Sequence, residues 1–303
     1  MLDLRRLRLL RDLEVRGTIG AVARALDYTP SAVSQQLAAL EREAGVPLLR
    51  RAGRRVVLTE AARVLVGHAE QLLAGVEEAE ADLAAASGEV AGTVRVAAFQ
   101  TAALHLVAPA MAAVTAAHPA VRVEVAESEL EDALTALRVG TADLLVGDEY
   151  AGQPRPRPPG LRREPLLTEE VRLVLPAAHP LAARRRVPLA ALRDSPWAAA
   201  QPGTGHREMI VRACRVLGGF EPDLRHRSND LLILLELVRS GGAVALLPDL
   251  VGAEADRSVA VRALAEGSVT RDLFLLSRAA GRARPALAAV REALAAQATR
   301  AGR

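Results

Sequence analysis

A polar stretch between residues 31 and 42 carries the side chains best suited to reading a nucleic acid. Ser31, Ser34, Gln35, Ala38 and Arg42 fall at positions i, i+3, i+4, i+7 and i+11. On a helix they share one face, where glutamine can pair with an adenine edge and serine with a base or a phosphate, while alanine permits close approach in a major groove. An ordinary solvated helix face is the alternative for this pattern taken alone.

Four arginines after this stretch are suited to holding a phosphate backbone. Arg50, Arg51, Arg54 and Arg55 flank a glycine between two apolar runs, a pattern typical of a two-stranded hairpin. Guanidinium groups on such a hairpin would lie on phosphates or in a minor groove. A surface hairpin with incidental charge is the competing interpretation, and the adjacent polar helix face favours the first.

Three short helices must position these side chains. Leucines recur every three residues over 2–15, which predicts a first helix. Thr18 is suited to capping a second helix over 19–26, and Thr29 followed by Pro30 marks the start of a third. The helices and the basic hairpin together predict a winged helix-turn-helix domain over residues 1–58.

The sequence of this head resembles the LysR-type transcriptional regulators. The resemblance is carried by GTIGAVARALDYTPSAVSQQLAALE (17–41), AGVPLLRR (44–51) and LTEAA (58–62), and it continues with lower specificity across nearly the whole chain. Ala62 replaces a glycine that is usual in the family, with little expected consequence because alanine is the better helix former. The resemblance implies that the third helix reads DNA. The candidate DNA contacts are Thr29, Ser31, Ser34, Gln35, Arg42, Arg50, Arg51, Arg54 and Arg55.

Residues 59–88 are expected to form a linker and dimerisation helix. The stretch contains no proline and repeats apolar residues every three or four positions, the a and d pattern of a coiled coil. The seam consists of Ala62, Leu65, Ala69, Leu72, Val76, Ala79, Leu83 and Ala86. A helix packed only on its own domain is the alternative, whereas the resemblance favours a linker that pairs two heads on an interrupted palindromic DNA operator.

Residues 89–303 alternate strand-like and helix-like segments, which predicts α/β architecture with parallel sheets. Strands are expected at 93–98, 121–126, 142–147, 170–175, 196–199, 243–247 and 269–276, and helices near 102–117, 129–139, 206–217, 229–239 and 285–298. A Pro-rich run at 153–160 suggests two lobes.

This body resembles the effector domain of the LysR-type regulators, which is similar to periplasmic solute-binding proteins. The resemblance implies that the chain crosses between the lobes twice, near 160–166 and 264–270. Lobe I would then cover about 89–162 and 268–303, and lobe II about 163–267.

Ligands in open α/β sheets bind beyond the carboxyl ends of strands, near helix N-termini. The candidate effector-binding residues at such places are Phe99, Gln100, Thr101, Ser128, Gln201, Gly203, Thr204, Asn229 and Asp230. Thr101 and Ser128 resemble family positions that hold a ligand's carboxylate or hydroxyl, whereas Phe99 and Gln100 stand where the family commonly has serine and proline. Taken singly, each is equally well explained as a plain helix cap.

The composition excludes several chemistries. All 39 basic residues are arginine, which excludes a Schiff base or a P-loop that depends on lysine. Cys214 is the single cysteine, so an internal disulfide and a Cys-rich metal site are excluded, while an intermolecular disulfide stays open. The net charge is +5 over 1–63, −6 over 64–92 and +4 over 93–303. A basic head, an acidic spacer and a nearly balanced body indicate three functional segments.

The first residues carry arginine and aspartate instead of an apolar run, so we expect no secretory signal and a cytoplasmic protein. Residues 96–117 are uncharged over a length that would span a membrane, but Pro109 and polar residues interrupt them. Strand, turn and buried helix is the preferred interpretation, and we expect no membrane partner.

These observations predict a dimeric or tetrameric DNA-binding regulator, with no cofactor or metal, that responds to a small effector between its lobes. RNA polymerase is an expected partner if the protein activates transcription. One rival is an enzyme on the two-lobed fold with Glu127 and Asp230 as its acidic pair; the sequence lacks a nucleophile elbow and a helical zinc motif. The other rival is a constitutive repressor with a vestigial cleft.

Overall fold

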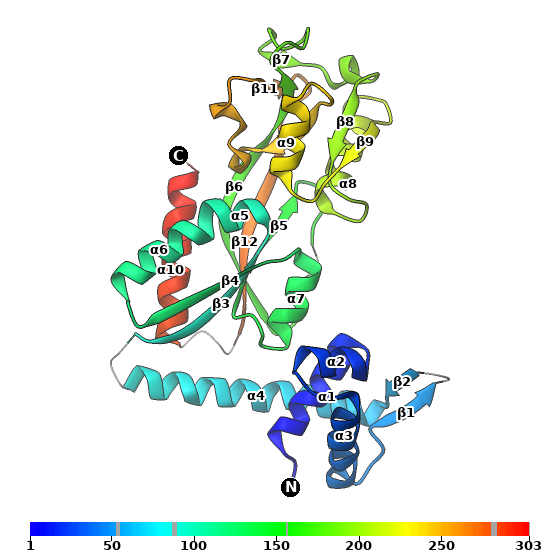
Figure 1. Ribbon diagram of the computed structural model, residues 1–303, viewed down its shortest axis with the longest axis vertical. Helices are drawn as coiled ribbons and strands as arrows, with labels where there is room; N and C mark the ends of the chain where they lie inside the picture. Colours follow the sequence, from blue (N-terminus) through cyan, green and yellow to red (C-terminus); the bar gives the residue numbers. More distant parts are fainter. Residues whose placement is uncertain (53–54, 87–89, 156, 280–283, 303) are drawn as a thin grey trace.

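The computed structural model describes residues 1–52, 55–86, 90–155, 157–279 and 284–302. A small head of helices and a hairpin is followed by one long helix and by a two-lobed α/β body (Figure 1). The expected fold class is therefore confirmed.

The head contains α1 (Leu4–Arg16), α2 (Ile19–Ala25), α3 (Pro30–Ala44), β1 (Leu49–Ala52) and β2 (Arg55–Leu58). The strands form an antiparallel hairpin in which Leu49 lies opposite Leu58. Thr29 caps α3, because its hydroxyl oxygen accepts a hydrogen bond from the N–H of Ala32. The helices bury one shared core of leucine, valine and alanine side chains, and this core fixes α3 against α1 and α2.

The long helix α4 (Glu60–Ala86) belongs to the head at its start and leaves it towards its end. Ala62, Val66 and Ala69 are buried in the core of the head. Further along, Leu72 and Leu83 are exposed. At a rise of about 1.5 Å per residue the helix spans roughly 40 Å, and it runs from the head along one end of lobe I (Figure 1).

Lobe I is built on three parallel strands, β3 (Gly92–Ala98), β4 (Val121–Glu127) and β5 (Leu144–Tyr150). A continuous helical run covers one face and consists of α5 (Gln100–Ala102), a π-helical turn η1 (Ala103–Val107) and α6 (Ala108–Ala117). The remaining helices are α7 (Leu130–Arg138) and α10 (Pro285–Ala301). Figure 1 shows α10 beside α6, and α7 on the side of the sheet that faces the head.

Lobe II surrounds the buried Trp197. Its strands are β7 (Arg186–Val187), β8 (Pro196–Ala199), β9 (Asp223–Arg227), β10 (Ala245–Pro248) and β11 (Val259–Leu264). Its helices are α8 (Gly205–Val216), α9 (Leu231–Arg239) and the short 3-10 turns η2 (Leu189–Leu192), η3 (Asp249–Val251) and η4 (Ala253–Ala255). The sequence did not predict β7, β9 or β11; β9 reads DLRHR and lacks an apolar run.

Two long antiparallel strands, β6 (Leu161–Pro176) and β12 (Val269–Arg278), join the lobes. They make the eight-stranded sheet mixed, in the order β4-β3-β5-β12-β6-β11-β7 with β10 also on β6. The expectation of parallel sheets holds for β3, β4 and β5 and for β8 and β9, but not where β6 and β12 pair with each other and with β5 and β10. β6 stays paired with β12 up to Val171, where its pairing with β10 begins. β6 is therefore shared by the two lobes, and the expected crossover near 160–166 stays a prediction.

The helical run Gln100–Ala117 is long and apolar enough, by length and composition alone, to cross a membrane. In the fold it packs on the sheet of lobe I, with Leu106, Ala110 and Val114 in the core. The predicted buried helix thus accounts for the uncharged stretch at 96–117.

Candidate functional sites: a polar helix face and a cavity between the lobes

The polar face of α3 points away from the core of the head. Val33, Leu37 and Leu40 are at most 1% exposed and form the buried side of the helix. The predicted contact residues on its other side are exposed, namely Thr29, Ser31, Ser34, Gln35 and Arg42. The helix therefore presents these side chains to solvent, as entry into a groove requires.

Most of these side chains already have a local partner. The hydroxyls of Thr29 and Ser31 lie 3.0 Å apart, and the Ser34 hydroxyl donates to the carbonyl of Pro30 at 2.9 Å. Arg42 Nε donates to the Ala38 carbonyl at 3.4 Å. Gln35 has no side-chain hydrogen bond among the described residues, so its amide is ready to pair with a base edge.

Glu41 holds the hairpin against α3. Its Oε1 accepts hydrogen bonds from the backbone N–H groups of Leu48 at 2.8 Å and Leu49 at 2.9 Å. Arg50 and Arg51 are exposed on β1. Arg54 and the side chain of Arg55 lie outside the described residues, so their predicted roles stay predictions.

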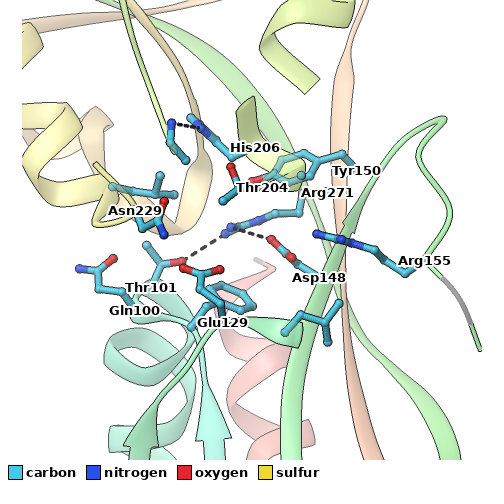
Figure 2. Close-up of a pocket in the computed structure, with 15 residues that line it drawn as sticks. Gln100, Thr101, Glu129, Asp148, Tyr150, Arg155, Thr204, His206, Asn229 and Arg271 are labelled. Atoms are coloured by element: carbon cyan, nitrogen blue, oxygen red, sulfur yellow. Dashed lines mark hydrogen bonds and ion pairs between the residues drawn. The ribbon is translucent and has the colours of Figure 1, made fainter. Parts of the chain in front are cut away.

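A second site lies where the two lobes meet (Figure 2). A cavity with about 50 Å³ of free volume has residues of both lobes around it. They are Phe99, Gln100, Thr101, Glu129, Leu130, Asp148, Tyr150, Arg155, Ala200, Thr204, Gly205, His206, Asn229, Leu231 and Arg271. The first turns of α5, α7, α8 and α9 all contribute, as expected for helices that follow the carboxyl ends of strands.

Arg271 lies at the centre of this cavity and is 1% exposed. Its Nη2 lies 2.6 Å from Glu169 Oε1, and its Nη1 lies 3.4 Å from Asp148 Oδ2. Nη2 also donates to the Thr101 hydroxyl at 3.3 Å. Burial raises the pKa values of Glu169 and Asp148, and the neighbouring guanidinium opposes that rise. The charge of Arg271 is thus shared between two carboxylates.

His206 and Tyr150 form a neutral wall beside Arg271. The rings lie edge to face, with centroids 6.2 Å apart. His206 Nδ1 accepts from the N–H of Ala200, so its Nε2 carries the proton that faces the Leu246 carbonyl at 2.8 Å. Burial lowers the pKa of His206 to about 4 and raises the pKa of Tyr150. Both groups are therefore uncharged near neutral pH.

Five of the nine predicted effector residues line the cavity: Phe99, Gln100, Thr101, Thr204 and Asn229. The other four, Ser128, Gln201, Gly203 and Asp230, do not.

Local structure explains where these four residues lie. Asp230 caps α9 through the N–H of Leu232, and the Ser128 hydroxyl donates to the carbonyl of Glu129. Gln201 is exposed and donates its N–H to Asn229, while Gly203 lies in an exposed turn with a φ of +87°.

Sequence reasoning missed the charged and aromatic lining. Asp148 and Tyr150 end β5, so the strand-end rule finds them once that strand is extended beyond its expected end at 147. The prediction named Ser128, whereas the next residue in the sequence, Glu129, lines the cavity. Arg271 gives no signal in the sequence, because it lies inside a strand.

Metal and thiol chemistry find little support in the described part of the chain. It contains no group of three or more His, Cys, Asp or Glu side chains placed to hold a metal ion. Cys214 is fully buried in the core of lobe II, and burial raises the pKa of its thiol to about 12.

Comparison with known proteins gives the family. Residues 4–63 match the bacterial regulatory helix-turn-helix proteins of the lysR family, and residues 87–299 match the LysR substrate binding domain. A probable hydrogen peroxide-inducible genes activator of Mycobacterium leprae is 33% identical over 77% of this chain and 73% of its own length. The transcriptional dual regulator GltC of Bacillus subtilis is 26% identical over 84% of this chain and 83% of its own.

Solved structures agree in fold. Full-length OxyR from Pseudomonas aeruginosa, with a cysteine substituted, matches with a TM-score of 0.71 and 21% identity over 97% of this chain and 95% of that one. Full-length CbnR in complex with its target DNA matches with a TM-score of 0.57 and 22% identity over 98% of this chain and 99% of that one. The resemblance noted in the sequence is confirmed, and the chain belongs to the LysR family of bacterial regulatory helix-turn-helix proteins.

Proposed function

We propose that the chain is a transcriptional regulator whose DNA binding, or whose activation of a promoter, is set by a small effector held between the lobes. The observation that carries the proposal is that one chain joins an exposed polar face on α3 to a polar cavity lined from both lobes. An effector that binds the closed lobes more tightly than the open ones shifts the chain towards the closed form. Such a shift reaches the DNA only through the position of the head.

On this proposal the target is a double-stranded operator with two half-sites. Gln35 and Ser31 on α3 read base edges, while Arg50 and Arg51 hold the backbone. A second copy of the chain supplies the other half-site, because the exposed Leu72 and Leu83 on α4 form the seam of a dimer. RNA polymerase is the further partner at promoters that are activated.

We place the protein in the cytoplasm and assign it no catalytic role. The acidic pair that an enzyme would need is not assembled: Glu127 is exposed at the end of β4, Asp230 caps α9, and neither lines the cavity. The lining acids that remain are Asp148, which is paired with Arg271, and Glu129 at the rim.

The size of the cavity limits the effector. A free volume of about 50 Å³ has room for a few water molecules, at roughly 10–15 Å³ each. Pockets that hold drug-sized ligands measure roughly 300–1,000 Å³. The effector is therefore a small molecule, or one that enters while the lobes are further apart.

The charges of the lining favour a hydrogen-bond donor over a simple carboxylate. Arg271 already shares its charge between Glu169 and Asp148, and Arg155 pairs with Glu131 at 2.9 Å. The side-chain carboxylate of Glu129 makes no hydrogen bond or ion pair among the described residues, and the Oε1 atom of Gln100 is buried without a partner. We therefore propose an effector that carries an amine or amide group facing these acceptors.

Cys214 argues against a direct thiol response to peroxide. Several relatives are named as probable hydrogen peroxide-inducible genes activators, and the reactive form of a cysteine is its thiolate. With a thiol pKa of about 12, full burial and no second cysteine, Cys214 has almost no thiolate at neutral pH. Treatment with hydrogen peroxide should leave the Cys214 thiol unoxidised and the DNA affinity of the protein unchanged.

Ligand binding and footprinting together test the proposal. A panel of small metabolites is screened for those that raise the Tm of the full-length protein, and each hit is added to a DNase footprint on a duplex selected by the protein from a random pool. The proposal expects at least one hit, and expects it to change the footprint. Turnover of a hit would favour the enzyme, and hits that never alter the footprint would favour the constitutive repressor.

Three matched compounds test the preference for a donor. Propylamine, propionamide and propionate have similar size and differ in charge, and ligand-detected NMR measures weak binding of each to the full-length protein. The amine and the amide should bind more tightly than the carboxylate, and Glu129→Gln should reduce the difference. Tighter binding of propionate would contradict the assignment.

A further inference from the structure

Helix α7 connects the cavity between the lobes to the DNA-binding head. Its N-cap residue Glu129 and its first residue Leu130 line the cavity. Nine residues later, a length of roughly 14 Å, its C-cap carbonyl on Val139 accepts a hydrogen bond from Arg11 Nη2 at 2.8 Å. Arg11 belongs to α1 of the head, so α7 contacts both the cavity and the head. Figure 1 shows α7 between the sheet of lobe I and the head.

The contact on the head side is buried and imperfectly satisfied. Arg11 is 5% exposed and Asp12 is 0% exposed, and their side chains form an ion pair at 3.2 Å. Arg11 Nε and Asp12 Oδ2 are buried without a hydrogen-bond partner. Removing charged groups from water costs about as much as such a pair returns. Because both members of this pair lie on α1, the pair stays within the head when Arg11 Nη2 separates from the Val139 carbonyl, so the hydrogen bond between head and lobe I can break and re-form.

The junction around this contact is loosely packed. A cavity of about 410 Å³ lies among the head, α4 and lobe I. Its lining includes Arg11, Glu70, Arg138, Gly160 and Leu161. The space lies directly beside the contact between the head and lobe I and leaves room there for a shift of the head.

The same end of α7 is tied to the cavity by a second element. Arg278, at the end of β12, donates to the carbonyls of Leu137 and Ala142 at 2.7 Å each. Arg271, on the same strand, occupies the cavity. The side chains of α7 and β12 also share one core, in which Leu137 packs with Leu276. Helix and strand thus move as one block between the cavity and the head.

Within the head, α1 is bonded to α3, the helix that carries the candidate DNA contacts. Arg6, five residues before Arg11 on α1, donates to Gln36 at 2.9 Å and pairs with Glu43, both of which lie on α3. The buried leucines of α1 pack in the same core as Val33 and Leu37. A change in the position of α1 therefore changes the position of α3.

We propose that α7 transmits occupancy of the cavity to the DNA-binding head through the contact between Arg11 and the Val139 carbonyl. The inference rests on the proposed function, because it names the path by which that effector acts. Arg11 is a positioning residue in this scheme. It holds the head in one placement, and movement of α7 changes that placement.

A covalent occupant replaces the unidentified effector in the test. The full-length chain carries Cys214→Ala and Asn229→Cys, and iodoacetamide adds a small amide at position 229 in the cavity lining. The Kd for a duplex selected from a random pool is measured by fluorescence anisotropy before and after alkylation. Three chains are compared: this one, the same chain with Arg11→Met, and a control with Arg122→Met, which removes an exposed arginine from β4, away from the junction.

Alkylation should change the Kd of the first and the control chain by about fivefold or more, the range of ordinary allosteric coupling. In the Arg11→Met chain the change should fall below about twofold. An equal change in all three chains overturns the role of Arg11 and leaves the proposed function standing. No change in any chain overturns cavity control of DNA binding itself, which is the proposed function. If Arg11→Met does not fold, as judged by circular dichroism, Arg11→Gln replaces it with the same expectations.

Discussion

Arg271 and Glu169 lie directly opposite each other on the two strands that join the lobes, with 2.6 Å between Nη2 and Oε1. Both side chains are at most 4% exposed. The pair fixes the register of β6 and β12 at the passage between the lobes, and it neutralises the cation that an anionic effector would otherwise use. The ion pair thus stabilises the contact between the two strands and limits which effectors the cavity can bind.

Replacing Arg271 by Met should strongly destabilise the protein. The substitution keeps much of the side-chain volume but leaves Glu169 buried without its cation, which costs about 3–5 kcal/mol. Arg172→Met is the matched control, because Arg172 lies on β6, three residues after Glu169, and its ion pairs are partly exposed, worth about 0–1 kcal/mol. Urea unfolding measures both. Equal losses of unfolding free energy in the two variants would show that the buried pair stabilises the protein no more than the exposed pairs do.

Gln35→Ala should reduce sequence discrimination. A glutamine that pairs with an adenine contributes about 1–3 kcal/mol against the wrong base, so the selected duplex should lose about tenfold or more in affinity while a scrambled duplex loses little. Gln36→Ala is the control, because the Gln36 amide is held by Arg6 within the head. Unchanged discrimination in the Gln35 variant would remove this residue from the reading face.

Arg51→Ala should weaken binding to every sequence alike. If its guanidinium contacts a phosphate, the slope of log K against log salt should become shallower by about 1. Arg185→Ala removes an exposed arginine from lobe II and should leave the slope unchanged. A slope that stays the same in the Arg51 variant would contradict a phosphate contact on the hairpin.

Stability should fall in mild acid because of His206. Its pKa in the folded chain is about 4, below the ordinary 6.5, so the unfolded chain takes up a proton first as the pH falls. Above pH 6.5 His206 has no effect on the free energy of unfolding. Below pH 6.5 it lowers that free energy progressively, by about 3 kcal/mol as the pH approaches 4. The difference in unfolding free energy between wild type and His206→Gln, measured across this range, isolates it. His68→Gln, at an exposed site on α4, should follow the wild-type profile; a His206→Gln profile parallel to wild type would refute the assignment.

The head could be predicted nearly residue by residue because its signals are local. The Thr29 cap, Pro30 at the first helical position and the apolar spacing of Val33, Leu37 and Leu40 all act within one helix. The cavity residues Thr101 and Thr204 could be predicted in the same way, because Thr101 lies in the first turn of α5 and Thr204 caps α8. Local patterns of this kind fix an element without knowledge of its neighbours.

The centre of the cavity could not be predicted because it depends on pairing between distant strands. Glu169 and Arg271 are about a hundred positions apart, and neither segment shows a simple alternation of apolar and polar residues. Charged residues and Pro165 in the first half of β6 hide a strand that continues through both lobes. The contact of Arg11 with Val139 likewise joins two modules whose sequences carry no common signal.

The most direct test of the account is the affinity of the full-length protein for its selected duplex, with and without the small molecule that raises its Tm most. The account predicts that a saturating amount changes the Kd by about fivefold or more. Thr101→Val, which removes the hydroxyl bonded to Arg271 inside the cavity, should reduce that change. An unchanged Kd and footprint with the cavity occupied would contradict the claim that the cavity controls DNA binding.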